Sequence, residues 1–289
     1  MGWFFEPGLF SSAPVRTALI VGAVVAVVSA IVGVFTVLRG QSFAGHSLAD
    51  VSTAGGSGAL LLGLSPLTGF LWGGILGALA MDLIGVQRVR GRDVATGIVL
   101  GAATGLAALF LYLDTTTQAI TGATQQILFG SIFSVDASTV PVVVVCGLLA
   151  LCLIAFIFRP LLLSSLSPEA AAARGVRVRL VGSLFMVALA AAVALSALAI
   201  GAILSTALLI GPAASSLRLT RRFGWSIALA AVLGVATTWL GIVLAYDSYY
   251  WSSSRTGLPV SFFIVSLVVL VYLASGLPAL RARSVRAGA

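Results

Sequence analysis

Long apolar runs, separated by short polar segments, make up most of the chain. A helix needs about 20 predominantly apolar residues to cross the hydrocarbon core of a bilayer. Eight runs meet this requirement: Thr17–Leu38, Phe43–Leu64, Leu67–Val86, Val94–Leu113, Val140–Phe158, Leu180–Ile200, Trp225–Ala245 and Pro259–Leu277. No linker-like segment divides the series. The pattern therefore predicts an all-α polytopic membrane protein whose residues 1–289 form a single transmembrane domain.

A ninth apolar run, Gly201–Leu217, is shorter and is interrupted by Gly211 and Pro212. If it crosses the membrane, the chain has nine spans; if it re-enters, the chain has eight. We expect about 8–9 transmembrane helices and favour the crossing. A broken helix is tolerated at membrane depth only where its freed backbone groups are buried in protein or face water. This run is therefore expected in the protein interior or beside a pathway.

The arginines orient the spans, because cytoplasmic loops of membrane proteins carry an excess of basic residues. Three groups follow the third, fifth and last spans: Arg88, Arg90 and Arg92, then Arg159 to Arg179, then Arg281, Arg283 and Arg286. The segments that hold Asp114 and Asp247 carry little positive charge and are expected to be outer loops. This distribution predicts a cytoplasmic C-terminus.

Composition excludes several classes of function. The chain is 60% hydrophobic and 8% charged, with a mean hydropathy of +1.16, whereas about 25% of a soluble domain is charged. All 16 basic residues are arginine, so the lysine that a nucleotide-binding P-loop requires is missing. The chain is therefore expected neither to hydrolyse ATP nor to act as another kind of enzyme. The loop positions of the arginines also argue against nucleic-acid binding.

His46 is the single histidine, and Asp50 follows it by four residues. Residues at this spacing share one face of a helix, and ionisable residues inside a membrane usually face a partner or a water-filled cavity. The pair could simply form a hydrogen bond that packs the helix. Alternatively, two symmetry-related copies would supply two imidazoles and two carboxylates, a set suited to Zn²⁺, Mn²⁺ or Fe²⁺.

A short polar helix is predicted in the longest arginine-rich segment. Ser167 suits an N-cap, Pro168 the first helical position and Glu169 the first turn, while Arg174 and Gly175 suit the end. Such a helix could dock on a cytoplasmic partner or could be an ordinary helix at the membrane interface.

Four stretches of the chain resemble the permease subunits of bacterial zinc/manganese ABC importers, the ABC-3 family. In order, they are VLRGQSFAGHSLAD from Val37 to Asp50, RDVATGI from Arg92 to Ile98, SPEAAAARGV from Ser167 to Val176, and IGAILSTALLIGPAA beginning at Ile200. The third and fourth stretches are the specific ones. One departure is visible: the family motif has the acid first and the histidine four residues later, the reverse of His46 and Asp50.

The resemblance implies a fold similar to that of the vitamin B12 importer permease and a homodimer, or a pseudo-dimer, in the bacterial cell membrane. It implies two cytoplasmic ATPase subunits that bind ATP, an extracytoplasmic metal-binding protein, and no permanently bound cofactor. The helix from Pro168 to Gly175 matches the family's coupling helix, with Glu169 and Arg174 as its polar contacts to the ATPase.

These features predict the permease subunit of an ATP-driven importer for zinc or manganese ions, with His46 and Asp50 as a transient metal site. One alternative is a related permease for a metal chelate such as haem, cobalamin or a siderophore. Another is an ion-coupled secondary transporter that uses His46 and Asp50 as its relay.

Overall fold

A computed structural model describes residues 12–84, 92–117, 122–130, 132–251 and 257–287. These parts are helical and contain no β-strand. The elements are α1 (Ala13–Leu38), α2 (Ser42–Leu61), α3 (Pro66–Ile84), α4 (Arg92–Thr117), α5 (Ala123–Phe129), the 3₁₀ turns η1 (Ile132–Ser134) and η2 (Ala137–Thr139), α6 (Val140–Leu166), α7 (Pro168–Ala173), α8 (Val178–Ile200), α9 (Ala202–Leu219), α10 (Phe223–Trp251) and α11 (Val260–Ala287).

Every predicted apolar run forms a helix. Within the described residues, seven helices are long and apolar enough to cross a membrane: α1, α3, α4, α6, α8, α9 and α10. The segment Val260–Gly276 of α11 is a further apolar helix. Helix α2 has 20 residues but carries serine, threonine, glycine, histidine and aspartate. The predicted all-α membrane fold is confirmed.

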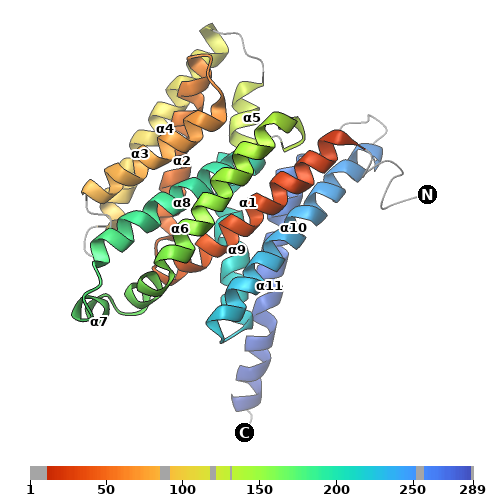
Figure 1. Cartoon of the computed structure of the whole chain (residues 1–289). Coiled ribbons are helices and arrows are strands. Elements are labelled where there is room, and N and C mark those ends of the chain that lie inside the picture. Colours follow the sequence, from red (N-terminus) through yellow and green to blue (C-terminus); the bar gives the residue numbers. More distant parts are fainter. Residues whose placement is uncertain (1–11, 85–91, 118–121, 131, 252–256, 288–289) are drawn as a thin grey trace.

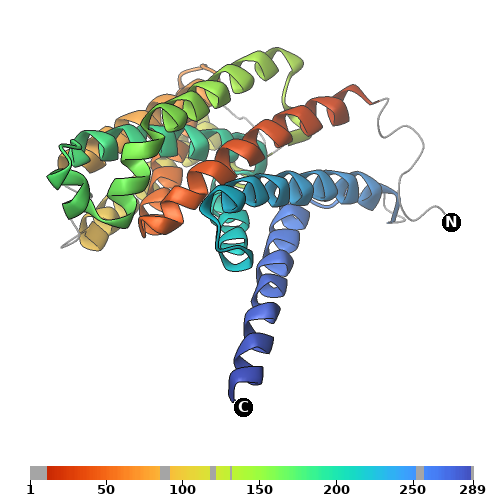
Figure 2. The same ribbon diagram turned by 60° about the horizontal axis from the view of Figure 1, so that its bottom comes forward.

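The long helices pack in three groups (Figure 1). Helices α2, α3 and α4 pack together at one side, and α9, α10 and α11 at the other, with α1, α6 and α8 between them. Figure 2 shows α11 leading away from the other helices toward the C-terminus. Helices α1 and α8 are the most buried, so they form the centre on which the two outer groups pack.

Small residues let α1 and α8 approach closely. The hydroxyl groups of Ser29 and Ser196 lie 2.6 Å apart, and both residues are fully buried. Ser196 also donates to the carbonyl oxygen of Ala192. Each buried hydroxyl therefore has a partner, which a polar group in an apolar interior needs.

The structure differs from the predictions at the outer segments. Asp114 and Asp247 are not in loops: they lie in the last turns of α4 and α10, and both are buried. The region between α4 and α6 also contains α5 and two 3₁₀ turns that the apolar pattern did not predict. Of the arginine clusters used for orientation, Arg88 and Arg90 lie outside the described residues.

Candidate functional site

His46 lies one turn into α2 and is half-buried. Its Nδ1 atom is 3.1 Å from the hydroxyl oxygen of Thr206 on α9. Helix α9 is the glycine- and proline-containing run that was expected in the interior or beside a pathway, and it packs against α1, α10 and α11 as well as α2. Thr206 orients the imidazole through Nδ1, and in the tautomer that carries its proton on Nδ1 the lone pair of Nε2 remains for a ligand.

Asp50 lies one turn further along α2 and is also half-buried. Its Oδ2 atom accepts a 2.7 Å hydrogen bond from the hydroxyl of Thr104 on α4. Thr104 is 3 residues beyond Gly101 on α4, so it lies on the helix face that also carries this glycine. The carboxylate is thus held from a second helix while its other oxygen has no partner among the described residues.

The two side chains do not bond each other. His46 is paired with α9 and Asp50 with α4, so the hydrogen bond between them that would merely pack α2 is absent from this part of the chain. Thr104 and Thr206 orient the two side chains in the way that outer-shell hydrogen bonds orient metal ligands. Neither threonine was singled out from the sequence.

One copy of the chain offers an incomplete metal site. Among the described residues, no group of three or more histidine, cysteine, aspartate or glutamate side chains could hold a metal ion. Tetrahedral zinc sites use four ligands, and manganese and iron commonly take more. Any ion at His46 and Asp50 would need ligands from water or from another molecule.

The short polar helix forms as predicted. Helix α7 begins at Pro168, and the hydroxyl of Ser167 accepts a 3.2 Å hydrogen bond from the backbone N–H of Ala170. Gly175 has a φ of 78°, and its N–H donates to the carbonyl oxygen of Ala172. This is the left-handed position at which helices commonly end, and glycine adopts it without strain.

Helix α7 exposes most of its surface. Pro168, Glu169, Arg174 and Gly175 are all exposed, whereas Ala171 is completely buried against the body of the protein. Figure 1 shows α7 at one extremity of the molecule, at the end of α6. A helix held by one buried alanine, with its charged residues pointing outward, is well placed for a protein partner.

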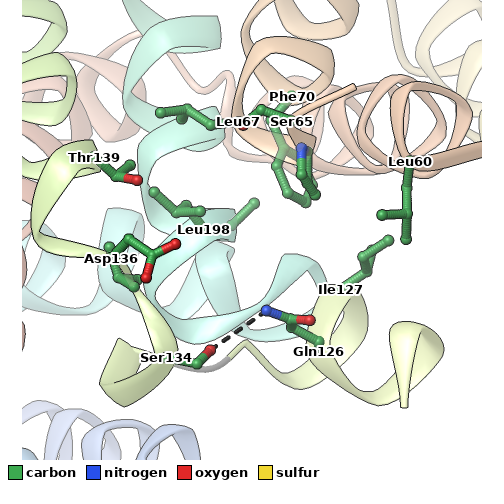
Figure 3. Close-up of a pocket in the computed structure, with 13 residues that line it drawn as sticks. Leu60, Ser65, Leu67, Phe70, Gln126, Ile127, Ser134, Asp136, Thr139 and Leu198 are labelled. Carbon is green, nitrogen blue, oxygen red and sulfur yellow. Dashed lines mark hydrogen bonds between the residues drawn. The ribbon is translucent and has the colours of Figure 1, made fainter. Parts of the chain in front are cut away.

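A pocket of about 160 Å³ lies between the start of α3, α5, η2 and the end of α8 (Figure 3). Its polar lining includes Asp136 and Thr139, and also Gln126, whose Nε2 donates to the hydroxyl of Ser134 over 3.4 Å. Leu198 and Phe70 supply apolar walls. No sequence motif predicts this pocket, because its lining residues come from four separate stretches of the chain. One exposed carboxylate does not make it a metal site.

Asp114 is a second feature without a sequence signal. It is fully buried, and neither carboxylate oxygen has a hydrogen-bond partner among the residues that the structure describes. An unpaired carboxyl group in a protein interior is costly. It lies 10 residues beyond Thr104 on the same helix, or about 15 Å along the axis, so it is not part of the His46 and Asp50 pair.

The chain is similar to curated metal-transport proteins. It is 29% identical over 243 residues to the manganese transport system membrane protein MntC of Listeria innocua, covering 84% of this chain and 85% of that protein. It is 30% identical over 260 residues to the chelated iron transport system membrane protein YfeC of Yersinia pestis, with coverages of 89% and 83%.

Solved structures agree with these relatives. PsaBC from Streptococcus pneumoniae, determined in complex with a Fab, superposes with a TM-score of 0.79 at 27% identity and covers 93% of each chain. The sequence model of the ABC 3 transport family matches residues 12–276. This range includes α2, α7 and α9. The chain therefore belongs to the ABC 3 transport family.

Proposed function

We propose that this chain is the permease subunit of an ATP-driven importer that carries a divalent transition-metal ion, manganese in the first place, across the bacterial cell membrane. The observation that carries the proposal is the presentation of His46 and Asp50 on one face of α2, each oriented by a threonine from another helix. The names of the relatives in Listeria, which are manganese transport proteins, support this metal over zinc. Family membership argues against an ion-coupled secondary transporter.

A second copy of the chain completes the metal site in this proposal. His46 and Asp50 of two copies give two imidazole nitrogens and two carboxylates around a two-fold axis. Helix α4 supplies a surface for that copy: a Cβ atom added at Gly97, Gly101 or Gly105 would meet nothing within 4 Å. Glycines at this spacing let membrane helices approach closely. Thr104, which holds Asp50, lies on the same side of α4.

The metal is bound weakly and briefly. A transported ion must enter a site that attracts it and leave without a large barrier. Two half-buried ligands, each held by one threonine, suit such a transient site better than a closed cage would. Nucleotide binding by the cytoplasmic ATPase partners would move α7, through Pro168, Glu169, Arg174 and Gly175, and change access to the site. An extracytoplasmic binding protein would deliver the ion, and the C-terminus would lie in the cytoplasm.

A chelated-iron substrate is the second candidate, because one relative of similar identity is named for chelated iron transport. A chelate already satisfies its metal, so it would not need the nitrogen of His46. A free ion would lose its preferred ligands on substitution of this residue. The two substrates are therefore separated by the same variant.

The decisive experiment measures metal binding and uptake with the purified permease. Competitive binding of manganese, zinc and iron(II) is measured in detergent for the wild type, His46→Ala and Asp50→Asn. Uptake of the same ions is then measured in liposomes that contain the permease and its ATPase. We expect about one manganese ion per dimer, lost in both variants. Asp136→Asn, which changes an exposed carboxylate away from α2, is the control and should bind normally.

Two results would overturn the proposal. If wild type and both variants bind equally well, His46 and Asp50 do not form the site. If His46→Ala takes up free ions as well as the wild type does, and the wild type also imports chelated iron, the substrate is the chelate.

A further inference from the structure

Arg39 lies where four helices meet at the end of the bundle that carries α7. It follows α1, and its N–H donates to the carbonyl oxygen of Phe35 over 2.9 Å. Its Nη1 atom donates to the hydroxyl oxygens of Ser164, at 3.2 Å, and Ser165, at 3.4 Å, in the last turn of α6. Its guanidinium carbon lies 5.4 Å from the ring centre of Phe185 on α8.

The same guanidinium reaches the start of α2. Nε of Arg39 donates to Oε1 of Gln41 over 3.3 Å. Gln41 is buried and immediately precedes α2, and its carbonyl oxygen accepts the N–H of Gly45, the residue before His46. Gln41 also donates its own N–H to the carbonyl oxygen of Thr36. The first turn of the helix that carries the metal ligands is thus fixed directly to Arg39.

Four aromatic rings pack together beside the guanidinium group of Arg39. Phe35 of α1 packs edge-on against Phe158 of α6, Phe185 of α8 and Phe223 of α10, with ring centres 5.7, 6.5 and 5.6 Å away. Edge-on aromatic packing and a cation over a ring face are both favourable and both depend on orientation. Arg39 therefore packs on a cluster of aromatic rings that come from four different helices.

Helix α7 is joined to this junction from both sides. Ser164 and Ser165 precede its N-cap, Ser167, by 3 and 2 residues, and Phe185 lies 7 residues into α8, which follows α7. A displacement of α7 moves the end of α6 and the start of α8 together. Since Arg39 contacts both, and also contacts Gln41, that displacement reaches α2.

We propose that Arg39 is a positioning residue that transmits movement of α7 to the metal-binding turn of α2. The inference rests on the proposed function, because it requires a partner that pushes α7. Arginine suits the role because its planar group presents several donors in fixed directions and can stack on an aromatic ring at the same time. A lysine would offer one compact charge and could not hold the α6 serines and Gln41 together.

The test compares Arg39→Met with wild type in liposomes that contain the permease and its ATPase. Methionine keeps much of the stem but removes every donor. We expect manganese uptake to fall at least about fivefold while ATP hydrolysis continues, so the number of ATP molecules consumed per ion rises by the same factor. Arg39→Lys should restore part of the coupling. Arg16→Met, an exposed arginine at the other end of α1, is the control and should leave the ratio unchanged.

A second variant, Ser164→Ala with Ser165→Ala, leaves Arg39 in place and removes its contacts to α6, together with the bonds that the two hydroxyls donate to the carbonyl oxygen of Leu161. This double variant replaces Arg39→Met in the test if the Arg39→Met protein does not fold or does not bind its ATPase. We expect it to show the same rise in the number of ATP molecules consumed per imported ion. A parallel loss of uptake, ATP hydrolysis and thermal stability in both variants would indicate a purely structural residue and overturn the inference, as would an unchanged ratio. Failure of the wild type to import any metal would instead refute the proposed function.

Discussion

Glycines at four-residue spacing occur in two neighbouring parts of the protein, with opposite surroundings. Between α2 and α3 they are in close contact: a Cβ atom on Gly69 would overlap the carbonyl oxygen of Gly55, and one on Gly73 would lie 2.9 Å from the Cα of Gly55. On α4, the glycines at 97, 101 and 105 meet nothing within 4 Å. The same spacing therefore serves packing inside the chain in one region and leaves an open helix face in the other.

Because of this difference, α2 and α3 form a tightly packed pair, whereas the glycine face of α4 is an exposed surface. Helices α2 and α3 cannot move apart or rotate without breaking backbone contacts, so α3 braces the helix that carries His46 and Asp50. Helix α4 packs on α2, and its buried residues include Ala103, Ala107 and Leu111. Its glycine face is the surface that we propose for contact with a second copy.

The largest effect is expected from a side chain placed inside the first region. Gly69→Val puts a branched side chain against the backbone of α2, which cannot yield as a flexible side chain would. Overpacking a rigid contact costs about 1–3 kcal/mol and more where backbone must move, so we expect a cost of about 3 kcal/mol and little folded protein. Thermal unfolding in detergent measures it, with Gly101→Val as the matched control. Equal stability of the two variants would refute the comparison.

The next effect concerns the open face. Gly101→Leu should leave the fold of the single chain intact, because the new side chain meets no atom of its own copy. In a symmetric dimer the new leucine occurs twice at the contact between the two copies. We therefore expect the dissociation constant of the dimer to rise at least about tenfold, with a parallel loss of metal binding. Mass measurement in detergent and cross-linking in membranes report the dimer. A stable dimer with a leucine at this position would place the second copy elsewhere.

A smaller effect is expected where α4 touches the ligand. Thr104→Val keeps the shape of the side chain but removes the hydroxyl that donates to Asp50. Loss of a hydrogen bond to a metal ligand typically lowers affinity about 10- to 100-fold, and we expect the lower part of that range because the site is open. Titration with manganese measures it. Thr68→Val, whose hydroxyl bonds only the local backbone at the start of α3, should bind as wild type.

Much of the architecture could be predicted from the chain itself. A run of about 20 apolar residues has few alternatives to a helix in a membrane, and seven helices of the described residues are long and apolar enough to cross one. Helix α7 was predictable because its cap and its end are encoded locally, by Ser167, Pro168 and Gly175. The shared face of His46 and Asp50 follows from helical periodicity alone.

The hydrogen-bond partners of His46 and Asp50 could not be predicted. Thr104 and Thr206 are 54 and 160 residues away from the side chains they hold, and nothing in their local sequence distinguishes them from other threonines in apolar helices. The contrast between Gly69 and Gly101 is hidden for the same reason: the spacing is identical, and only the packing of α2, α3 and α4 decides which glycine has a neighbour. Asp114 and Asp247 looked like loop residues because polar neighbours surround them in sequence.

The smallest effect tests whether the α2–α3 contact is steric or polar. Ser52 of α2 is buried, and its hydroxyl has no hydrogen-bond partner among the described residues. A Cβ atom on Gly74 of α3 would lie 2.7 Å from that oxygen. Because a buried hydroxyl without a partner costs about 1–3 kcal/mol, Ser52→Ala should leave thermal stability unchanged or raise it slightly. Ser29→Ala is the matched control, since it removes a buried hydroxyl that contacts Ser196, and it should lower the free energy of unfolding by about 1 kcal/mol. A larger loss for Ser52→Ala than for Ser29→Ala would mean that a polar contact, and not the close approach of glycine backbones, holds α3 to α2.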